Sequence, residues 1–478
     1  MMNETDNQRI EAEVVVIGGG PGGYAAAFRA ADLGKQVVLI DSRDHLGGVC
    51  LLEGCVPSKA MISASELFHS MHDAETMGIT CEGLHLDMKK LGGWRDDIVL
   101  QMSKGIEGLA KRRNVRWIRG KACFADTHRL ILQESAVSSV KFQNVILATG
   151  SRPFVPTPFV ADGRQVLTSS DILQLKKIPE TLLVIGGGYI GLEMGGCFRM
   201  MGSEVTIVEL TDQLLPGTDR DLVEVVARKL KADGVTVLLE TKVTALKSSE
   251  DGVTSTLMSK DQQSRVVDFK KVLMAVGRLP NTENLGLDRI GLQLDGMGRI
   301  PVDQQCRTQL DHVFAVGDCT TGPMLAHKAR RQGLVAAEVL CGHEAIFDPR
   351  AIPAVIFSSP EIAYSGLSEY QAQELGRDVK TGRFWFRGNP RAQTLLQNEG
   401  FAKIISDRET EEILGIRMVG PCASELLAEA TLAIEMGATL EDMIATIHAH
   451  PTLAETMLEA AEVTRGQAVH FFDPRNRG

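Results

Sequence analysis

Residues 13–23 read EVVVIGGGPGG, and this stretch decides the fold of the N-terminal part of the chain. The β-branched run at its start is typical of a buried parallel strand. The alanine-rich residues 24–33 predict a helix after the glycines, and residues 37–41 predict a second parallel strand. Strand, glycine loop, helix and strand together predict a βαβ unit of the nucleotide-binding kind.

Three glycines of this loop have separate tasks in such a unit. Gly18 permits the tight turn, Gly20 lets the backbone approach a pyrophosphate, and Gly23 lets the helix pack against the strand. The start of the helix then faces the phosphates. Asp41, which lies 23 residues past Gly18, can accept hydrogen bonds from a ribose. The loop therefore predicts a dinucleotide site rather than a plain glycine turn.

A second copy of this unit lies later in the chain, where residues 181–191 read TLLVIGGGYIG. An offset of 168 residues places the matching glycines at Gly186, Gly188 and Gly191. The same offset places an acid, Glu209, at the position that matches Asp41 of the first copy. An internal duplication is more specific than either loop alone, and it predicts two dinucleotides, a flavin and a nicotinamide.

Glu209 bears on the choice of nicotinamide. Its carboxylate would accept the 2′-hydroxyl of NAD but would repel the 2′-phosphate of NADP. No arginine follows closely, because residues 210–213 read LTDQ. We therefore predict NAD at the second site.

Between the two loops, residues 47–59 read GGVCLLEGCVPSK, with Cys50 and Cys55 five positions apart. A cysteine pair beside a nucleotide site suggests electron transfer between the nucleotide and sulfur. The alternative is a pair of buried, inert thiols. We give that interpretation to the other cysteines, which are Cys81, Cys123, Cys197, Cys306, Cys319, Cys341 and Cys422. No metal site is expected, because no second cysteine or histidine pair lies at ligand spacing.

Together these motifs resemble the flavin-dependent pyridine nucleotide–disulfide oxidoreductases, and among them the dihydrolipoamide dehydrogenases most closely. The resemblance also rests on AVGR at 275–278, AVGD at 315–318, GPMLAHK at 322–328 and HAHPTLAE at 448–455. It implies an α/β fold with two Rossmann-like domains, one binding FAD and one binding NAD, and a C-terminal α+β dimerisation domain. It also implies a homodimer.

The resemblance assigns roles to individual positions. Cys50 and Cys55 would form a redox disulfide, in which Cys50 meets the substrate and Cys55 meets the flavin. Lys59 and Glu193 match an ion pair near flavin N5, although each alone would be interpreted as a solvated surface charge. The positions that match FAD contacts are Gly18, Gly20, Gly23, Asp41, Gly48, Lys59, Ala122, Thr149, Gly150, Asp318, Met324, Leu325, Ala326 and His327. Those that match NAD contacts are Gly186, Gly188, Gly191, Glu209, Val243 and Gly277.

One departure falls inside the redox stretch. The family usually has Cys-Leu-Asn-x-Gly-Cys, whereas Leu52 and Glu53 occupy the third and fourth positions here. If the Glu53 carboxylate pointed at the sulfurs, it would raise the pKa of Cys55 and disfavour its thiolate. If it pointed to solvent, little would change.

Disulfide exchange with a dithiol needs a base, because only the thiolate attacks. Histidine titrates near the operating pH and suits this task. The resemblance implies that His450 is the base, that Glu455 orients it, and that the pair serves the other subunit's disulfide. Glu455 also has capping-box spacing from Thr452, so a helix cap is an alternative. We expect His448 to be structural.

The resemblance implies oxidation of protein-bound dihydrolipoamide by NAD through FAD. The lipoyl groups would be carried on acyltransferase or glycine-cleavage carrier proteins. Among related enzymes, glutathione reductase would need basic residues after the second βαβ strand, mercuric reductase a C-terminal cysteine pair, and a soluble transhydrogenase no redox pair. A flavoprotein kept mainly as a scaffold or regulator is a further alternative, for which the Leu52–Glu53 departure leaves room.

At 478 residues, the chain is long enough for two to four domains. We expect an FAD-binding domain at 1–152, an NAD-binding domain at 153–279, a central segment completing the FAD domain at 280–351, and an interface domain at 352–478. The net charge of −10 argues against a nucleic-acid partner. Residues 1–11 lack signal-peptide character and no apolar run reaches membrane-spanning length, so we expect a cytoplasmic protein without a membrane span.

Overall fold

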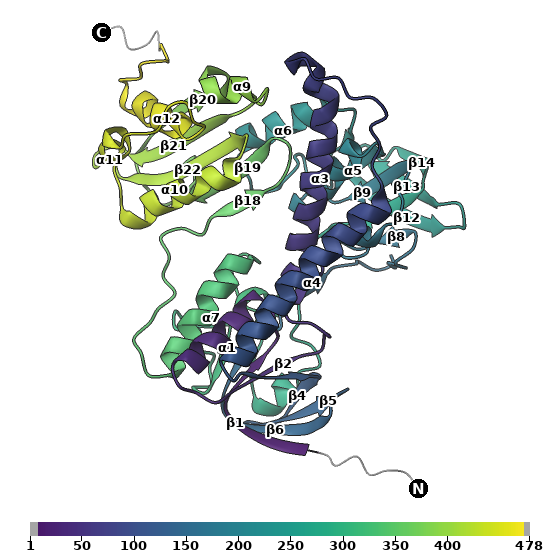
Figure 1. Cartoon of the computed structure of the whole chain (residues 1–478), viewed down its shortest axis with the longest axis vertical. Helices are drawn as coiled ribbons and strands as arrows, with labels where there is room; N and C mark the ends of the chain where they lie inside the picture. The colour runs from purple at the N-terminus through teal and green to yellow at the C-terminus, as the bar shows by residue number, and fades with distance from the viewer. Residues whose placement is uncertain (1–7, 473–478) are drawn as a thin grey trace.

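The computed structural model describes residues 8–472 and has three parts (Figure 1). The N-terminal sheet lies at the bottom of the view, the second nucleotide-binding unit at the upper right and the C-terminal sheet at the upper left. Two long helices, α3 (Cys55–Asp73) and α4 (Met88–Arg112), run from the first unit towards the upper part of the molecule. Among residues 8–472, no helix combines the length and the apolar character needed to cross a membrane.

The first nucleotide-binding unit is built on a seven-stranded sheet. β1 (Gln8–Ile17) pairs in parallel with β2 (Val37–Asp41) on one side and with β6 (Val137–Leu147) on the other. The helix after the glycine loop, α1 (Pro21–Asp32), begins earlier than expected, because proline is well tolerated in the first turn of a helix. The remaining strands are β3 (Arg116–Arg119), β4 (Lys121–Asp126), β5 (Arg129–Gln133) and β17 (Val313–Ala315).

The segment after the second unit returns to this first sheet. β17 pairs in parallel with β6, so a strand from the segment expected at 280–351 extends the sheet that carries the first loop. The helix α7 (Ala326–Leu340) follows and packs directly against α1 (Figure 1).

The second unit repeats the pattern on a smaller scale. Its five-stranded sheet is parallel throughout, in the order β11-β10-β9-β15-β8. These strands are β8 (Val166–Leu167), β9 (Thr181–Ile185), β10 (Glu204–Val208), β11 (Thr236–Leu238) and β15 (Lys271–Met274). Its helices are α5 (Tyr189–Met200) and α6 (Arg220–Ala232). A separate antiparallel sheet is formed by β12 (Thr241–Ser248), β13 (Val253–Ser259) and β14 (Ser264–Phe269).

The chain crosses between the two units twice, and the crossings pair with each other. β7 (Ser151–Pro153) and β16 (Arg278–Pro280) form a two-stranded antiparallel ribbon. The ribbon joins the two units side by side.

The C-terminal part is an antiparallel five-stranded sheet in the order β18-β19-β22-β21-β20. Its strands are β18 (Ala354–Ile356), β19 (Glu361–Gly366), β20 (Val379–Trp385), β21 (Phe401–Asp407) and β22 (Ile413–Gly420). Its helices are α8 (Glu369–Glu374), α9 (Pro390–Thr394), α10 (Ala423–Met436), α11 (Leu440–Ala445) and α12 (Glu455–Arg465). α10 packs on β19 and β22, and α12 packs on β20 and β21.

Several short elements complete the fold. They are α2 (Gly48–Leu52), η1 (Ala74–Met77), η2 (Ile172–Gln174), η3 (Leu287–Ile290), η4 (Gly317–Cys319) and η5 (Phe386–Gly388). The two nucleotide-binding units with parallel strands, and the antiparallel C-terminal sheet with its helices, confirm the predicted α/β fold class.

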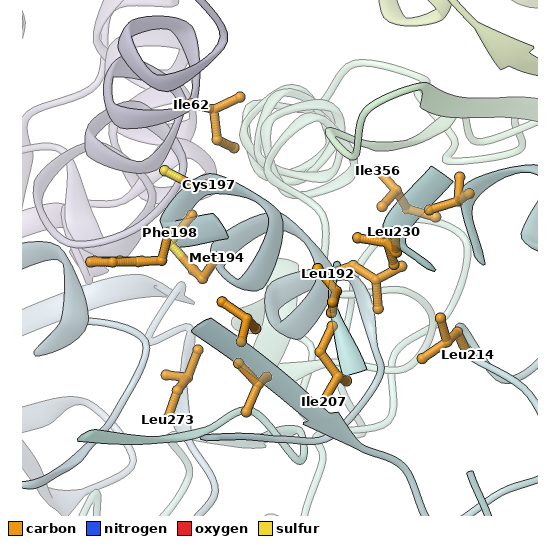
Figure 2. Packing of buried hydrophobic residues seen from close by; sticks show 14 of the residues in the cluster. Ile62, Leu192, Met194, Cys197, Phe198, Ile207, Leu214, Leu230, Leu273 and Ile356 are labelled. Atoms are coloured by element: carbon orange, nitrogen blue, oxygen red, sulfur yellow. The ribbon is translucent and has the colours of Figure 1, made fainter. Parts of the chain in front are cut away.

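One hydrophobic core crosses all three parts. Figure 2 shows Ile62 of α3 beside Cys197 and Phe198 of α5, with Ile356 of β18 in the same cluster. Phe401 of β21 also belongs to it. Because burying apolar surface is the main favourable term in folding, this shared core fixes the three parts relative to one another.

Candidate active site

A cleft of about 1140 Å³, counting its open mouth, is lined by residues of both nucleotide-binding units. It gathers thirteen of the predicted site residues, which are Gly18, Gly20, Asp41, Gly48, Cys50, Cys55, Lys59, Thr149, Gly150, Glu193, Asp318, Met324 and Ala326. Residues that lie far apart in the sequence therefore meet in one concave site.

The glycines of the first loop allow close approach of the backbone. A Cβ atom at Gly23 would lie 1.7 Å from the carbonyl oxygen of Gly18, so any larger residue would push the helix away from the loop. Gly48 has φ +61°, and a Cβ atom there would lie 2.5 Å from the Cα of Gly20. The redox stretch thus packs directly against the nucleotide loop, and Gly20 and Gly48, which have no side chains, form a cradle between them.

The two duplicated acids hold their loops by the same hydrogen bond. The Asp41 carboxylate accepts from the backbone N–H of Gly19 at 2.6 Å, and the Glu209 carboxylate accepts from that of Gly187 at 2.7 Å. A carboxylate has about four acceptor sites, so each retains capacity for a ribose hydroxyl. The duplication therefore extends from sequence to hydrogen bonding.

Cys50 and Cys55 are free thiols at the start of two consecutive helices, in α2 and at the first residue of α3. A hydrogen bond from Cys50 and the charge of Lys59 lower the pKa of Cys55 to about 7, although burial opposes this. The same hydrogen bond, together with burial, raises the pKa of Cys50. A helix N-terminus also favours a thiolate. The two sulfurs are thus chemically distinct, with Cys55 the better thiolate.

Lys59 and Glu193 form an ion pair beside these sulfurs. The Nζ of Lys59 lies 2.8 Å from Oε2 of Glu193, whose side chain is only 5% exposed. The other Glu193 oxygen accepts from the backbone N–H of Phe357 at 3.1 Å, and Lys59 lies over the Phe357 ring. Glu193 is therefore not a solvated surface charge, because it links all three parts of the fold at the cleft.

Both carboxylate oxygens of Glu53 have partners other than the redox pair. Its Oε1 accepts from Nε of Arg43 at 2.9 Å, and its Oε2 accepts from the hydroxyl of Ser170 at 3.4 Å. Burial acts to lower the pKa of Arg43, but the hydrogen bond and charge of Glu53 and the charge of Asp41 outweigh it, so that pKa is raised. The extra carboxylate of the redox stretch is therefore paired with a cation.

A hydrogen-bonded chain links Asp318 to the second unit. Ser151 donates from its hydroxyl to Oδ2 of Asp318 at 2.6 Å, and Nε of Arg278 donates to that hydroxyl at 2.8 Å. Arg43, Ser151, Tyr189 and Arg278 all line the cleft and were not predicted as site residues. Arg278 and Tyr189 lie within motifs that the sequence singled out, so those motifs held a usable signal, whereas nothing in the sequence marked Arg43 or Ser151.

Other predicted residues lie outside the cleft lining. They are Gly23, Ala122, Gly186, Gly188, Gly191, Glu209, Val243, Gly277, Leu325, His327, His450 and Glu455. Val243 is buried in the core beneath the second unit, and Ala122 is buried beneath the first. His327 is exposed and contacts the carbonyl oxygen of Pro353. Their assigned roles stay predictions.

His450 and Glu455 form a pair near the start of α12. Nδ1 of His450 lies 2.9 Å from Oε1 of Glu455, and Oε2 of Glu455 accepts from the backbone N–H of Thr452 at 2.7 Å. The carboxylate thus contacts both His450 and the backbone just before α12, whose N-cap is Ala454 without a side-chain cap hydrogen bond, so Thr452 and Glu455 do not form the capping box of the alternative interpretation. With Nδ1 donating to the carboxylate, Nε2 is left as the basic nitrogen on a side chain that is 68% exposed.

His448, two residues before His450, has different surroundings. It is 5% exposed, and its two ring nitrogens lie 2.9 Å from the carbonyl oxygen of Thr446 and 2.8 Å from Oε1 of Glu429. These contacts suit the structural role expected of it. Among residues 8–472, no group of three or more histidine, cysteine or acidic side chains is arranged to hold a metal ion.

The interpretation of the remaining cysteines as buried was wrong for two of them. Cys81 and Cys422 are exposed, Cys123 and Cys341 are partly buried, and Cys197, Cys306 and Cys319 are buried as expected. Cys81 lies in an irregular stretch between η1 and α4.

Comparison with known proteins identifies the family of this chain. Residues 12–333 match the family model described as pyridine nucleotide-disulphide oxidoreductase, and residues 352–461 match the dimerisation domain of the same family. The chain is 43% identical to a dihydrolipoyl dehydrogenase of Geobacillus stearothermophilus, with 97% of this chain and 98% of the relative covered. It is 44% identical to dihydrolipoyl dehydrogenase 2 of Haloarcula marismortui, with 96% and 98% covered.

Solved structures agree with the fold. The crystal structure of LpdA from Mycobacterium tuberculosis superimposes with a TM-score of 0.88 at 29% identity, covering 94% of this chain and 99% of that one. The HOCl-induced flavoprotein disulfide reductase RclA from Escherichia coli gives a TM-score of 0.84 at 25% identity, covering 94% and 99%. The resemblance seen in the sequence is confirmed, and the chain belongs to the pyridine nucleotide–disulphide oxidoreductases, a family that works with FAD and a nicotinamide nucleotide.

Proposed function

We propose that this protein oxidises protein-bound dihydrolipoamide to lipoamide and reduces NAD to NADH. The observation that carries the proposal is the hydrogen-bonded pair Cys50 and Cys55, which lies in a cleft formed by two duplicated nucleotide units. Relatives covering nearly the whole chain are named dihydrolipoyl dehydrogenase.

In this proposal, residues 1–152 with 280–351 hold FAD and residues 153–279 hold NAD. The cradle formed by Gly20 and Gly48, where a Cβ atom at Gly48 would lie 2.5 Å from Gly20, suits a pyrophosphate, and the carboxylate of Asp318 suits a sugar-alcohol chain. Glu209, fixed by Gly187, would accept the ribose hydroxyls of NAD. FAD, when bound, would supply a two-electron acceptor between the thiols and NAD.

The thiols have different tasks in the oxidised enzyme, where they are joined as a disulfide. A substrate thiolate attacks Sγ of Cys50, the bond between Cys50 and Cys55 breaks, and Cys55 leaves as a thiolate. The second substrate thiolate then attacks the mixed disulfide, which forms lipoamide and returns Cys50 as a thiol. Lys59 stabilises the Cys55 thiolate, because its charge lowers the pKa of that sulfur.

His450 removes the substrate protons through Nε2, and Glu455 holds the ring in the tautomer this requires. Neither residue lines the cleft of its own chain, and the His450 side chain is open to solvent. The chain carries the family's dimerisation domain. We therefore place His450 at the disulfide of the partner subunit in a homodimer.

The lipoyl substrates would arrive on acyltransferase or glycine-cleavage carrier proteins, and the enzyme would work in the cytoplasm, where reducing conditions keep stray thiols free. The test compares dihydrolipoamide with NAD against glutathione disulfide with NADPH, at equal enzyme concentration. We expect turnover in the first assay and at most trace activity in the second. The reverse ranking would contradict the proposal, and inactivity in both would favour a scaffold or regulatory role.

A further inference from the structure

The redox stretch carries a carboxylate, Glu53, at the position that the family pattern leaves variable. Glu53 lies two residues before Cys55 and lines the same cleft. Its two oxygens have different partners, Nε of Arg43 at 2.9 Å and the hydroxyl of Ser170 at 3.4 Å. The cation comes from the loop after β2 and the hydroxyl from the second nucleotide-binding unit, so both oxygens are engaged by groups outside the redox pair.

We propose that Arg43 is a positioning residue, which neutralises Glu53 and holds it away from Cys55 and so preserves the thiolate on which the proposed function rests. The charges facing Cys55 explain why such a residue is needed. Cys55 is faced by Cys50 from α2, by Lys59 from α3 and by Glu193 from α5. The single cation among them is already shared with Glu193 at 2.8 Å.

An uncompensated carboxylate at position 53 would therefore make the surroundings of Cys55 net negative. A nearby like charge disfavours ionisation of a thiol. Because the Arg43 and Glu53 side chains are 33% and 39% exposed, salt screens their interaction in part, and the test belongs at low ionic strength.

The side chain of Arg43 can be changed without releasing its backbone. The backbone N–H of Arg43 donates to Oδ1 of Asp41 at 2.8 Å, independently of the guanidinium. The variants are therefore Arg43→Gln, Arg43→Met, Glu53→Gln and the double variant Arg43→Gln/Glu53→Gln. Arg119→Gln is the matched control, because Arg119 pairs with Asp44 at 2.6 Å nearby but does not line the cleft.

Each full-length, FAD-loaded variant is reduced anaerobically with two electron equivalents of dithionite. The long-wavelength charge-transfer absorbance between thiolate and flavin is then followed against pH. We expect Arg43→Gln and Arg43→Met to move its midpoint upward by about 0.5 pH or more, because the freed carboxylate disfavours the thiolate. The double variant and Arg119→Gln should stay within about 0.2 of the unmodified enzyme, whereas Glu53→Gln, which leaves the Arg43 cation unpaired, should not move the midpoint upward.

The double variant makes the result specific to the carboxylate, since damage to the fold would not be repaired by removing Glu53. If Arg43→Gln titrates like Arg119→Gln, or if the double variant keeps the shift of the single one, the positioning role is overturned. If the unmodified enzyme shows no such band at any pH, the proposed function itself fails. The two failures are therefore distinguishable.

Discussion

At the residue scale, the hydrogen bond from Cys50 and the charge of Lys59 together favour ionisation of Cys55 at neutral pH. The pKa of Cys55 is lowered to about 7 by the hydrogen bond from Cys50 and by Lys59. A thiol with a lowered pKa is ionised above that value and becomes protonated as the pH falls through it. Thiolate-dependent absorbance of the reduced, FAD-loaded enzyme should therefore be strong at pH 8 and fade below pH 7.

Substituting Lys59→Met should move this titration upward by about one pH unit or more, because the nearest cation is lost. The charge-transfer absorbance at pH 8 should then fall to about half of its normal value or less. Lys104→Met, which removes an exposed lysine on α4, is the control and should leave the titration in place. An unchanged titration in Lys59→Met would show that another group sets the pKa of Cys55.

Glu455 is the second residue at which one side chain decides the chemistry. Glu455→Gln removes the charge that fixes His450, and we expect turnover of dihydrolipoamide to fall about 10²-fold, within the usual range for acid–base catalysis. Reduction of an artificial dye by NADH does not require a substrate thiol to lose its proton, so it should be unchanged. Equal losses in both assays would indicate a structural effect.

At the element scale, the duplicated loops offer a paired test of which unit holds which nucleotide. A Cβ atom at Gly191 would lie 2.0 Å from the carbonyl oxygen of Gly186, which matches the clash at Gly23 in the first loop. Gly191→Ala should raise KM for NADH at least tenfold while FAD stays bound, and Gly23→Ala should release FAD. Gly196→Ala on α5 meets no atom within 4 Å and is the control.

These losses would be measured as flavin absorbance after gel filtration and as KM for NADH in the dye assay. If Gly191→Ala lost FAD and Gly23→Ala weakened only NADH binding, the assignment of the two units would be reversed. Gly196→Ala should bind both nucleotides normally, because alanine is the better helix former.

The same contrast explains what the sequence could predict at the level of elements. The duplicated loops and the redox stretch could be predicted because glycine geometry and apolar periodicity act over neighbouring residues. The Arg43–Glu53 pair could not, because it depends on where two loops meet after folding. Ile62 and Ile356 share a core for the same reason, although no local pattern joins them.

At the scale of the whole molecule, a buried ion network joins the second unit to the C-terminal sheet. Nζ of Lys403 on β21 lies 2.8 Å from Asp221, 3.1 Å from Glu369 and 3.4 Å from Asp219, and its side chain is 5% exposed. Arg383 on β20 pairs with the same Asp221. Removing one partner of a fully buried pair typically costs about 3–5 kcal/mol, and the cost here is smaller, because Asp221 and Glu369 are 26% and 40% exposed and Asp221 keeps Arg383 as a partner.

Lys403→Met should therefore lower the thermal midpoint by several degrees. The matched control is Lys380→Met on the adjacent strand, whose pair with Glu411 is 3.8 Å long and about one-third exposed, and such surface pairs contribute about 0–1 kcal/mol. Both variants should be melted at one protein concentration, since dimer stability depends on it. Equal melting of the two variants would show that the network adds nothing to the docking of the two parts.

The proposed position of His450, at the partner's disulfide, predicts how two inactive variants should behave when they form a mixed dimer. The histidine and the cysteines act in one site only if two subunits meet, so Cys50→Ser and His450→Gln chains should complement each other. A mixed dimer has one site with an intact Cys50 from one chain and an intact His450 from the other. Random reassembly of equal amounts should restore about one quarter of normal turnover, because half the dimers are mixed and each has one good site.

Cys50→Ser mixed with a Cys50→Ser/His450→Gln chain is the control and should stay inactive. Inactivity of the first mixture, with mixed dimers shown to form by differently tagged chains, would place His450 and the disulfide within one subunit.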